Sequence, residues 1–195
     1  MTDPTDHTDL RQALISAAPL DNEAVARLVP HFIEKDILEN CLLVRQDTPE
    51  TDEILLLSGR CVAYILSQDG EQVHLGFYDA PAVLPPHISR TKDGFSLLNI
   101  EMLTPGCVAM ISAATLLDLM VDNAAIRTWG NDIMRQQLLH QSTHQWALAA
   151  LGGKARLLWL REHFEQLEDK FDHWRLASFL AMTPVSFSRI RNALD

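Results

Sequence analysis

The spacing of apolar residues divides the chain into a strand-rich first part and a helical second part. Between residues 37 and 114, apolar runs of strand length alternate with turn signals such as Ser58-Gly59 and Gln68-Asp69-Gly70. The predicted strands are residues 41–45, 53–57, 61–66, 72–78, 97–103 and 107–111. Many short strands at regular spacing favour a small antiparallel barrel or sandwich.

Helical spacing is found on both sides of this region. Asp21 is a predicted N-cap for an early helix that should end near Pro30, and residues 1–9 are expected to be disordered. Residues 116–120 predict a short apolar helix, and residues 124–150 a long one. The long helix repeats one set of positions at steps of three and four: Ile126, Trp129, Ile133, Gln137, His140, His144, Ala147 and Leu151.

A smaller helical domain should follow the long helix. Gly152 and Gly153 break the helical pattern and are the best candidates for a boundary and hinge. A helix over residues 154–167 is predicted next. Its core-facing positions are Leu157, Leu160, Phe164 and Leu167.

Residues 173–194 predict two short helices joined by a tight turn. Thr183 suits the N-cap of the second helix, and Pro184 suits its first position. One face of that helix carries Phe187, Ile190 and Leu194, and the other carries Ser186, Ser188, Arg189, Arg191 and Asn192. This is a helix-turn-helix with a polar, cationic second helix, the shape that enters a DNA major groove. A plain antiparallel helix pair at the end of a small domain would show the same pattern, and that alternative stays open.

A family resemblance favours the DNA-binding interpretation. Residues 177–191, A-S-F-L-A-M-T-P-V-S-F-S-R-I-R, resemble the A-S-x-L-G-[IM]-T-P-x-[ST]-[LF]-S-R-I-R stretch of short bacterial regulators in the cyclic-AMP receptor protein / fumarate-nitrate regulator (Crp/Fnr) family. Ala181 replaces the glycine usual in the turn. If that turn needs a positive φ, the alanine costs about 1 kcal/mol.

The resemblance extends over most of the chain. Residues 42–60 resemble the family's L-x-x-x-G-x-x-x-D-x-x-x-x-L-x-x-G-x-V pattern, with Asp47 in place of its first glycine, and residues 69–78 resemble the hairpin that follows. The implied fold is α+β: a cyclic-nucleotide-binding-type antiparallel β-roll, a long dimerisation helix and a C-terminal helix-turn-helix domain. We expect a tail or helix at residues 1–18, the roll at 19–120, the dimerisation helix at 121–151 and the DNA-binding domain at 152–195, without the β-hairpin wing of longer relatives.

The resemblance also implies partners and contact residues. These are double-stranded DNA, a second copy of the chain and, for such regulators, RNA polymerase. Arg189 matches the family's base-reading arginine, whereas Pro184 and Val185 replace an Arg-Glu pair, so the operator must differ. The expected DNA contacts are Thr183, Ser186, Ser188, Arg189 and Arg191. The expected dimer seam is Ile126, Trp129, Ile133, Gln137, His140 and His144, and the alternative is that its first three residues simply cover the roll.

The region that would cradle a cyclic phosphate departs from the family pattern. The Gly-Glu-Leu sequence is missing, and the family's Arg-Ser pair falls on Ser96 and Leu97. Arg90, Lys92 and Ser96 could form a displaced anion site, or this stretch could be a solvated loop. We therefore expect a degenerate sensor that does not bind cyclic AMP in the usual way, with an unknown small-molecule effector.

Charge and cysteine content limit the remaining possibilities. The net charge of −10 argues against a nonspecific nucleic-acid binder, but the part from Gly152 onward has a balance of +1. A local positive face suffices for DNA because salt screens charges beyond roughly 8 Å. Cys41, Cys61 and Cys107 lie apart in strand-like runs, which predicts buried, reduced thiols.

Metal, membrane and catalytic signals are weak. His74, His87, His140 and His144 lack acidic or thiol partners at ligand spacing, so no metal and no cofactor are expected. The sequence has neither a long apolar run nor a leader-like N-terminus, so we expect a cytoplasmic protein without membrane association. Catalytic motifs are missing, so an enzyme is not expected.

The competing hypothesis is an effector-binding or protein-interaction module of this fold that has lost DNA binding. The acidic net charge, Ala181 and the missing wing favour it.

Overall fold

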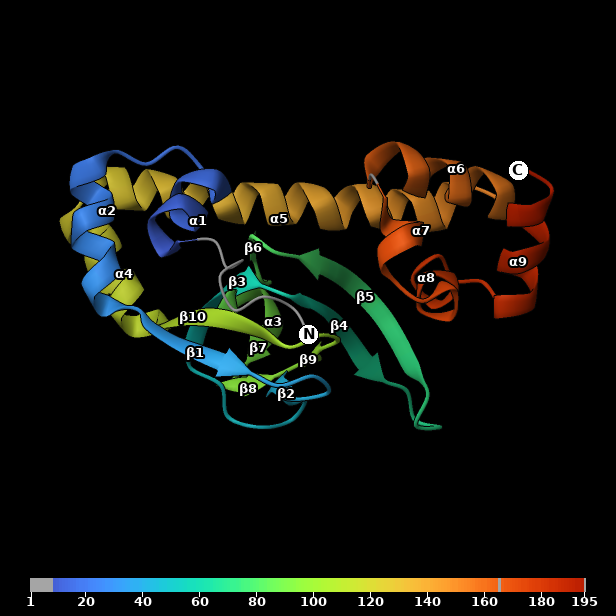
Figure 1. Cartoon of the computed structure of the whole chain (residues 1–195), viewed down its shortest axis with the longest axis horizontal. Coiled ribbons are helices and arrows are strands. Elements are labelled where there is room, and N and C mark those ends of the chain that lie inside the picture. The colour runs from blue at the N-terminus through green and yellow to red at the C-terminus, as the bar shows by residue number, and fades with distance from the viewer. Residues whose placement is uncertain (1–8, 165, 195) are drawn as a thin grey trace. The chain divides into compact units, whose positions relative to one another are not determined.

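The computed structural model describes residues 9–164 and 166–194, which divide into two compact units (Figure 1). The N-terminal unit comprises the described residues up to Ala63 together with Phe77–Gln137. The C-terminal unit comprises Tyr64–Gly76 together with the described residues from Leu138 onward. The division falls within the long helix, whereas the sequence suggests a boundary at Gly152. None of the helices in the described part is long and apolar enough to cross a membrane.

Antiparallel strands form a roll of two four-stranded sheets and a short ribbon. The first sheet has the order β1 (Ile33–Ile37), β10 (Gly106–Ser112), β3 (Asp52–Ser58) and β6 (Ala82–Val83). The second has the order β2 (Leu42–Val44), β9 (Asn99–Met102), β4 (Arg60–Leu66) and β5 (Gln72–Asp79), and β7 (Thr91–Lys92) pairs with β8 (Phe95–Ser96). Together with the helices, these sheets confirm the predicted α+β roll.

The six predicted strands are present with small shifts at their ends, but the edge strand β1 and the two-residue strands β6, β7 and β8 were not predicted. The five residues of β1, Ile33–Ile37, are three consecutive charged residues between two isoleucines and are largely exposed, so they show no apolar run. Pairing with β10, from Ile33 opposite Met110 to Ile37 opposite Gly106, makes this segment a strand.

Gly59 and Asp47 are among the turn residues of the roll that have positive φ angles. Gly59, between β3 and β4, has φ of 89°, and a Cβ there would lie 2.8 Å from the carbonyl oxygen of Pro105. Asp47, at the place of the family's first glycine, has φ of 60°. Aspartate tolerates the left-handed region better than most residues, so the turn persists without glycine.

Short helices cover one face of the first sheet. They are α1 (Leu10–Ala17), α2 (Asn22–Leu28), the 3-10 turn η1 (Val29–His31), α3 (His87–Arg90) and α4 (Ala113–Asp122). The side chain of Asp21 accepts a hydrogen bond from the Ala24 amide at 2.8 Å, which confirms the predicted cap. The expected disorder of residues 1–8 lies outside the described residues.

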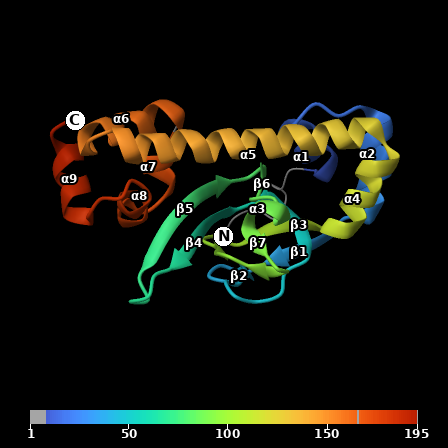
Figure 2. The same ribbon diagram turned by 180° about the vertical axis from the view of Figure 1, so that it is seen from behind.

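The core of the N-terminal unit lies between these helices and the first sheet. Leu14, Leu28, Leu55 and Ala109 form one buried cluster with the start of α5 (Ala124–Ala150). The indole nitrogen of Trp129 donates a hydrogen bond to the carbonyl of Leu14 at 3.0 Å. Figures 1 and 2 show α1, α2 and α4 gathered around the first turns of α5.

Cys61 and Cys107 are buried as predicted, but Cys41 is exposed, which corrects that expectation.

The C-terminal unit contains the second half of α5 and four further helices. These are α6 (Gly153–His163), α7 (Leu167–Lys170), α8 (His173–Phe179) and α9 (Pro184–Asn192). The predicted span of α5 is confirmed. The helix predicted over 154–167 ends at His163, and the chain passes through Gln166, with φ of 60°, before α7 begins.

Candidate functional site

Helices α8 and α9 form the predicted helix-turn-helix, and α9 begins with a well-built cap. The Thr183 hydroxyl accepts a hydrogen bond from the Ser186 amide at 3.2 Å and donates one to the Ser186 hydroxyl at 3.0 Å. Pro184 occupies the first turn, where its missing N–H costs no helical hydrogen bond. Phe187 is fully buried and anchors α9 in the small domain.

The opposite face of α9 is open to solvent. Val185, Ser188 and Arg189 are exposed, as is Thr183 at the cap, whereas Ser186 is half-buried. Arg189 therefore presents its guanidinium from the middle of a short helix, with small neighbours that allow another surface to approach. A cation and hydroxyl groups in this arrangement can donate hydrogen bonds to phosphate oxygens and base edges.

Arg191 differs from its expected position. It is half-buried, and its NH1 lies 3.1 Å from both ring nitrogens of His173 in α8. Residue 191 follows 189 by roughly 200° around a helix, so the two side chains leave α9 in different directions. The guanidinium of Arg191 thus contacts its own unit, and Arg189 is the cation on the open face of α9.

The turn between α8 and α9 adopts the conformation that glycine favours. Ala181 has φ of 51°, which is the left-handed region. Arg156, in α6, holds this turn: its NH1 donates to the carbonyls of Leu180 and Ala181 at 2.9 and 3.3 Å. Its Nε and NH2 donate to Leu151 and Leu148 at the end of α5. The role of Arg156 is not visible in the local sequence, because its four carbonyl acceptors come from segments up to 25 residues away.

The expected dimer seam points inward instead of outward. Ile126, Trp129 and Ile133 are 0%, 2% and 9% exposed and belong to the core cluster of the N-terminal unit. This corrects the prediction in favour of the stated alternative that they cover the roll. Gln137, four residues after Ile133 on the same helix, is half-buried.

His140 and His144 also face their own unit. The ring of His140 packs edge-on against Phe164, with centroids 5.2 Å apart. The ring of His144 stacks on Phe179 at 3.9 Å, and its Nε2 donates to the Phe179 carbonyl at 2.9 Å. Burial lowers the pKa of both histidines. Their surroundings are those of packing residues.

A different face of α5 is apolar and exposed. Leu138, Leu139 and Trp146 have exposed fractions of 57%, 64% and 56%. At roughly 100° per residue, Leu138 and Ser142 lie about 160° around the helix from the mean direction of Trp129 and Ile133, and Leu139 and Trp146 lie about 100–120° from it. Water-exposed leucine and tryptophan in one stripe are typical of a surface that another protein covers.

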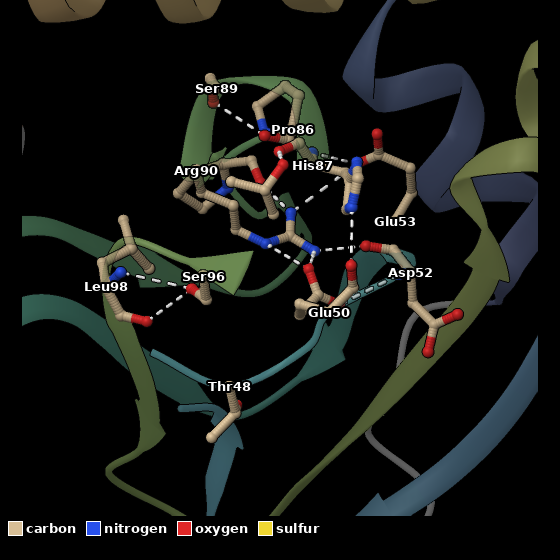
Figure 3. Close-up of polar contacts among 12 residues, drawn as sticks. Thr48, Glu50, Asp52, Glu53, Pro86, His87, Ser89, Arg90, Ser96 and Leu98 are labelled. Atoms are coloured by element: carbon tan, nitrogen blue, oxygen red, sulfur yellow. Dashed lines mark hydrogen bonds and ion pairs between the residues drawn. The ribbon is translucent and has the colours of Figure 1, made fainter. Parts of the chain in front are cut away.

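Arg90 is buried in a polar cluster of its own unit (Figure 3). Its Nε and NH2 lie 3.0 and 2.7 Å from a carboxylate oxygen of Glu50. NH1 and NH2 also donate to the carbonyls of Pro85 and Asp52. The guanidinium is thereby neutralised and its donors are used by the chain itself.

The other two residues of the expected anion site do not join Arg90. Lys92 is exposed on β7. Ser96 is buried, and its hydroxyl donates to the carbonyl of Leu98 at 2.7 Å. Arg90, Lys92 and Ser96 therefore do not come together as the displaced anion site would require.

Comparisons with solved structures agree on the architecture. The c-di-GMP-responsive global regulator CLP of Xanthomonas campestris is 15% identical, with a TM-score of 0.71 over 89% of this chain and 91% of that one. FixK2 of Bradyrhizobium japonicum is 16% identical, with a TM-score of 0.69 and 84% of each chain covered. A protein of Eubacterium rectale described as a Crp/Fnr-family regulator is 16% identical, with a TM-score of 0.68 over 92% and 87%.

Sequence comparison gives no further identification, since no family model and no characterised protein sequence matches this chain. At 15–16% identity the structural likeness establishes the fold. An antiparallel roll, a long helix and a C-terminal helix-turn-helix unit are shared with these regulators. The chain therefore has the fold of the Crp/Fnr regulators.

Proposed function

We propose that this protein is a DNA-binding transcription regulator that acts as a homodimer. The observation that carries the proposal is the open face of α9, where Arg189 projects from a capped helix whose other side is anchored by Phe187. Such a helix fits the major groove, and an arginine there can bind the O6 and N7 atoms of guanine. The fold shared with known regulators supports the same function.

A second copy would supply the second recognition helix. A single helix of this length buries little surface on DNA, whereas two helices about 34 Å apart can read a two-fold symmetric site. The exposed stripe of Leu138, Leu139 and Trp146 supports a dimer through α5. This dimer would use a different face of the helix from the seam expected from the sequence. Leu139 and Trp146 are seven residues apart, the spacing of one position in a two-stranded coiled coil.

The N-terminal unit is proposed to be a sensor that does not hold a cyclic phosphate in the usual way. The guanidinium of Arg90 already donates hydrogen bonds to Glu50 and to two backbone carbonyls of its own chain. An anion would have to compete with a buried carboxylate for the same guanidinium, which costs free energy that a solvated phosphate does not recover.

Selection of duplexes from a random pool, followed by anisotropy titration of the best sequence, tests DNA binding. We expect a two-fold symmetric site and an affinity that falls steeply with salt. Arg189→Ala should weaken binding by about 10- to 100-fold and relax the preference at one base pair of each half-site, because a bidentate base contact is lost.

The matched control is Arg11→Ala, which removes an exposed arginine of α1 and changes the net charge equally. It should leave the affinity nearly unchanged. If the pool yields no enriched duplex, or if both variants weaken binding alike, α9 is not a recognition helix.

The competing proposal is an interaction module of this fold without DNA binding. The contact between Arg191 and His173 favours it, because it removes one cation from the surface that DNA would meet. Failure of the selection experiment with a correctly folded protein would favour this alternative.

A further inference from the structure

A cavity of about 500 Å³ lies in the N-terminal unit, outside the functional surfaces described so far. Leu55 and Val83 of the first sheet, Leu116 and Met120 of α4, and Trp129 and Ile133 of α5 form its apolar walls. Glu53, His87 and Asn131 are its polar members. Its size and mixed lining are those of pockets that bind small molecules.

The cavity is on the helix-covered side of the first sheet. Leu55 belongs to the cluster that contains Trp129 and Ile133, whereas its buried neighbours Ile54 and Leu56 point to the other side of β3. The space between the two sheets is therefore not involved. A ligand here would touch α3, α4 and α5 at once.

One wall of the cavity depends on a glycine inside a long helix. A Cβ at Gly130 would lie 2.8 Å from the terminal methyl carbon of Met120 and 2.9 Å from its sulfur. Glycine within a helix costs roughly 1 kcal/mol relative to alanine, and here it lets the flexible Met120 side chain lie against α5. Methionine can adapt to ligands of different shape, so this wall can adjust to an occupant.

The polar groups of the cavity favour a hydrogen-bond donor. Glu53 accepts a hydrogen bond from the His87 amide at 2.9 Å. Burial raises the pKa of its carboxyl, whereas this hydrogen bond and the charge of Arg90 act in the opposite direction and favour the carboxylate. The guanidinium of Arg90 lies 3.8 Å from Glu53, but its donors are directed to Glu50 and to backbone carbonyls (Figure 3). Glu53 therefore offers an acceptor to the cavity, and an anionic ligand would face a carboxylate.

We propose that this cavity binds a small apolar molecule, neutral or cationic, whose hydrogen-bond donor reaches the carboxylate of Glu53. The inference goes beyond the proposed function, because ligand binding in the N-terminal unit requires neither DNA nor a dimer. It also names a ligand chemistry opposite to that of a cyclic nucleotide.

Two fluorescent dyes that share one skeleton test the proposal. N-phenyl-1-naphthylamine is neutral and apolar and carries one N–H donor. Its sulfonated analogue, 1-anilinonaphthalene-8-sulfonate, adds a negative charge. Titrated into the full chain without DNA, the amine should saturate at one site per chain, and the sulfonate should bind at least about tenfold more weakly because its charge is unpaired.

Substitutions locate the dye. Ala113→Phe, at the cavity wall, should weaken binding of the amine at least about tenfold by filling the space. The matched control Ala114→Phe adds the same side chain to an exposed position of α4 and should leave binding unchanged. Val83→Phe fills the cavity from the sheet and serves as the second variant if Ala113→Phe fails to fold by circular dichroism.

Glu53→Gln tests the charge preference. Removing the negative charge should narrow the affinity gap between the two dyes. The proposal is overturned if the neutral amine does not bind, if folded cavity-filling variants bind it as the original chain does, or if Glu53→Gln leaves the gap unchanged.

Discussion

At the residue scale, Ala181 stands where the resembling family has glycine, and its backbone is strained as a result. Its φ of 51° places a Cβ-bearing residue in the left-handed region that glycine enters freely. The sequence flagged this position because the related turns carry glycine, but the backbone angle itself is a tertiary result. Arg156, which donates to the Leu180 and Ala181 carbonyls, helps to hold the turn in place.

We expect Ala181→Gly to stabilise the protein by about 1 kcal/mol, because the left-handed strain is relieved. Urea unfolding followed by tryptophan fluorescence measures the change. The matched control is Ala193→Gly at the end of α9, where φ is −90° and glycine brings no relief. Equal effects of the two substitutions, or a loss of stability in Ala181→Gly, would contradict the strain argument.

At the element scale, α5 has two apolar faces, and sequence spacing does not say which one is covered by its own chain. Trp129 and Ile133 are buried in the N-terminal unit, whereas Leu139 and Trp146 are exposed. Both sets repeat at helical steps, so both satisfy the pattern from which a seam is predicted. Packing against α1 and the first sheet decides between them, and those contacts are distant in sequence.

The double substitution Leu139→Glu and Trp146→Glu should shift the protein from dimer to monomer, because charge would enter the proposed seam. Light scattering after size-exclusion chromatography reports the mass. Gln141→Glu, an exposed position at the side of this stripe, is the control and should remain dimeric. If the double variant keeps the mass of the original protein, dimerisation uses another surface.

At the scale of the whole molecule, buried histidines in the C-terminal unit link folding to pH. Burial, and then the charge of Arg175, lowers the pKa of His74 to about 4. His74 Nε2 lies 3.2 Å from Arg175 NH1, a contact that suits a neutral imidazole. Burial lowers the pKa of His140 and His144 in the same direction.

The stability of the chain should therefore fall as the pH is lowered from about 7 to about 4.5. In that range the unfolded chain, whose histidines have an ordinary pKa of about 6.5, binds more protons than the folded one. The slope for one histidine is at most about 1.4 kcal/mol per pH unit. Urea unfolding at several pH values measures it.

His74→Gln should flatten this dependence, while His31→Gln, at an exposed position, should not. A stability that stays constant down to about pH 5 would mean that the buried histidines are not linked to folding in this way.

The order and type of most elements followed from local patterns in the amino-acid sequence. Alternating runs and turn residues located six strands, and helical spacing located α5 and the helix-turn-helix. Side-chain caps such as Thr183 act on amides three residues away, so their signals are local. Helical spacing is also a local signal. It placed Arg189 on the face of α9 away from the buried Phe187, and Arg189 is exposed.

Contacts between residues far apart in the chain could not be read from those patterns and depend on how the elements pack. Arg90 is enclosed by Glu50 and by carbonyls from other segments, Arg191 reaches His173, and the cavity forms where α3, α4 and α5 approach the first sheet. Periodicity reveals that a helix has an apolar face, but the choice of neighbour for that face depends on contacts between segments far apart in the chain. Those contacts carry the free energy of packing, and no local pattern records them.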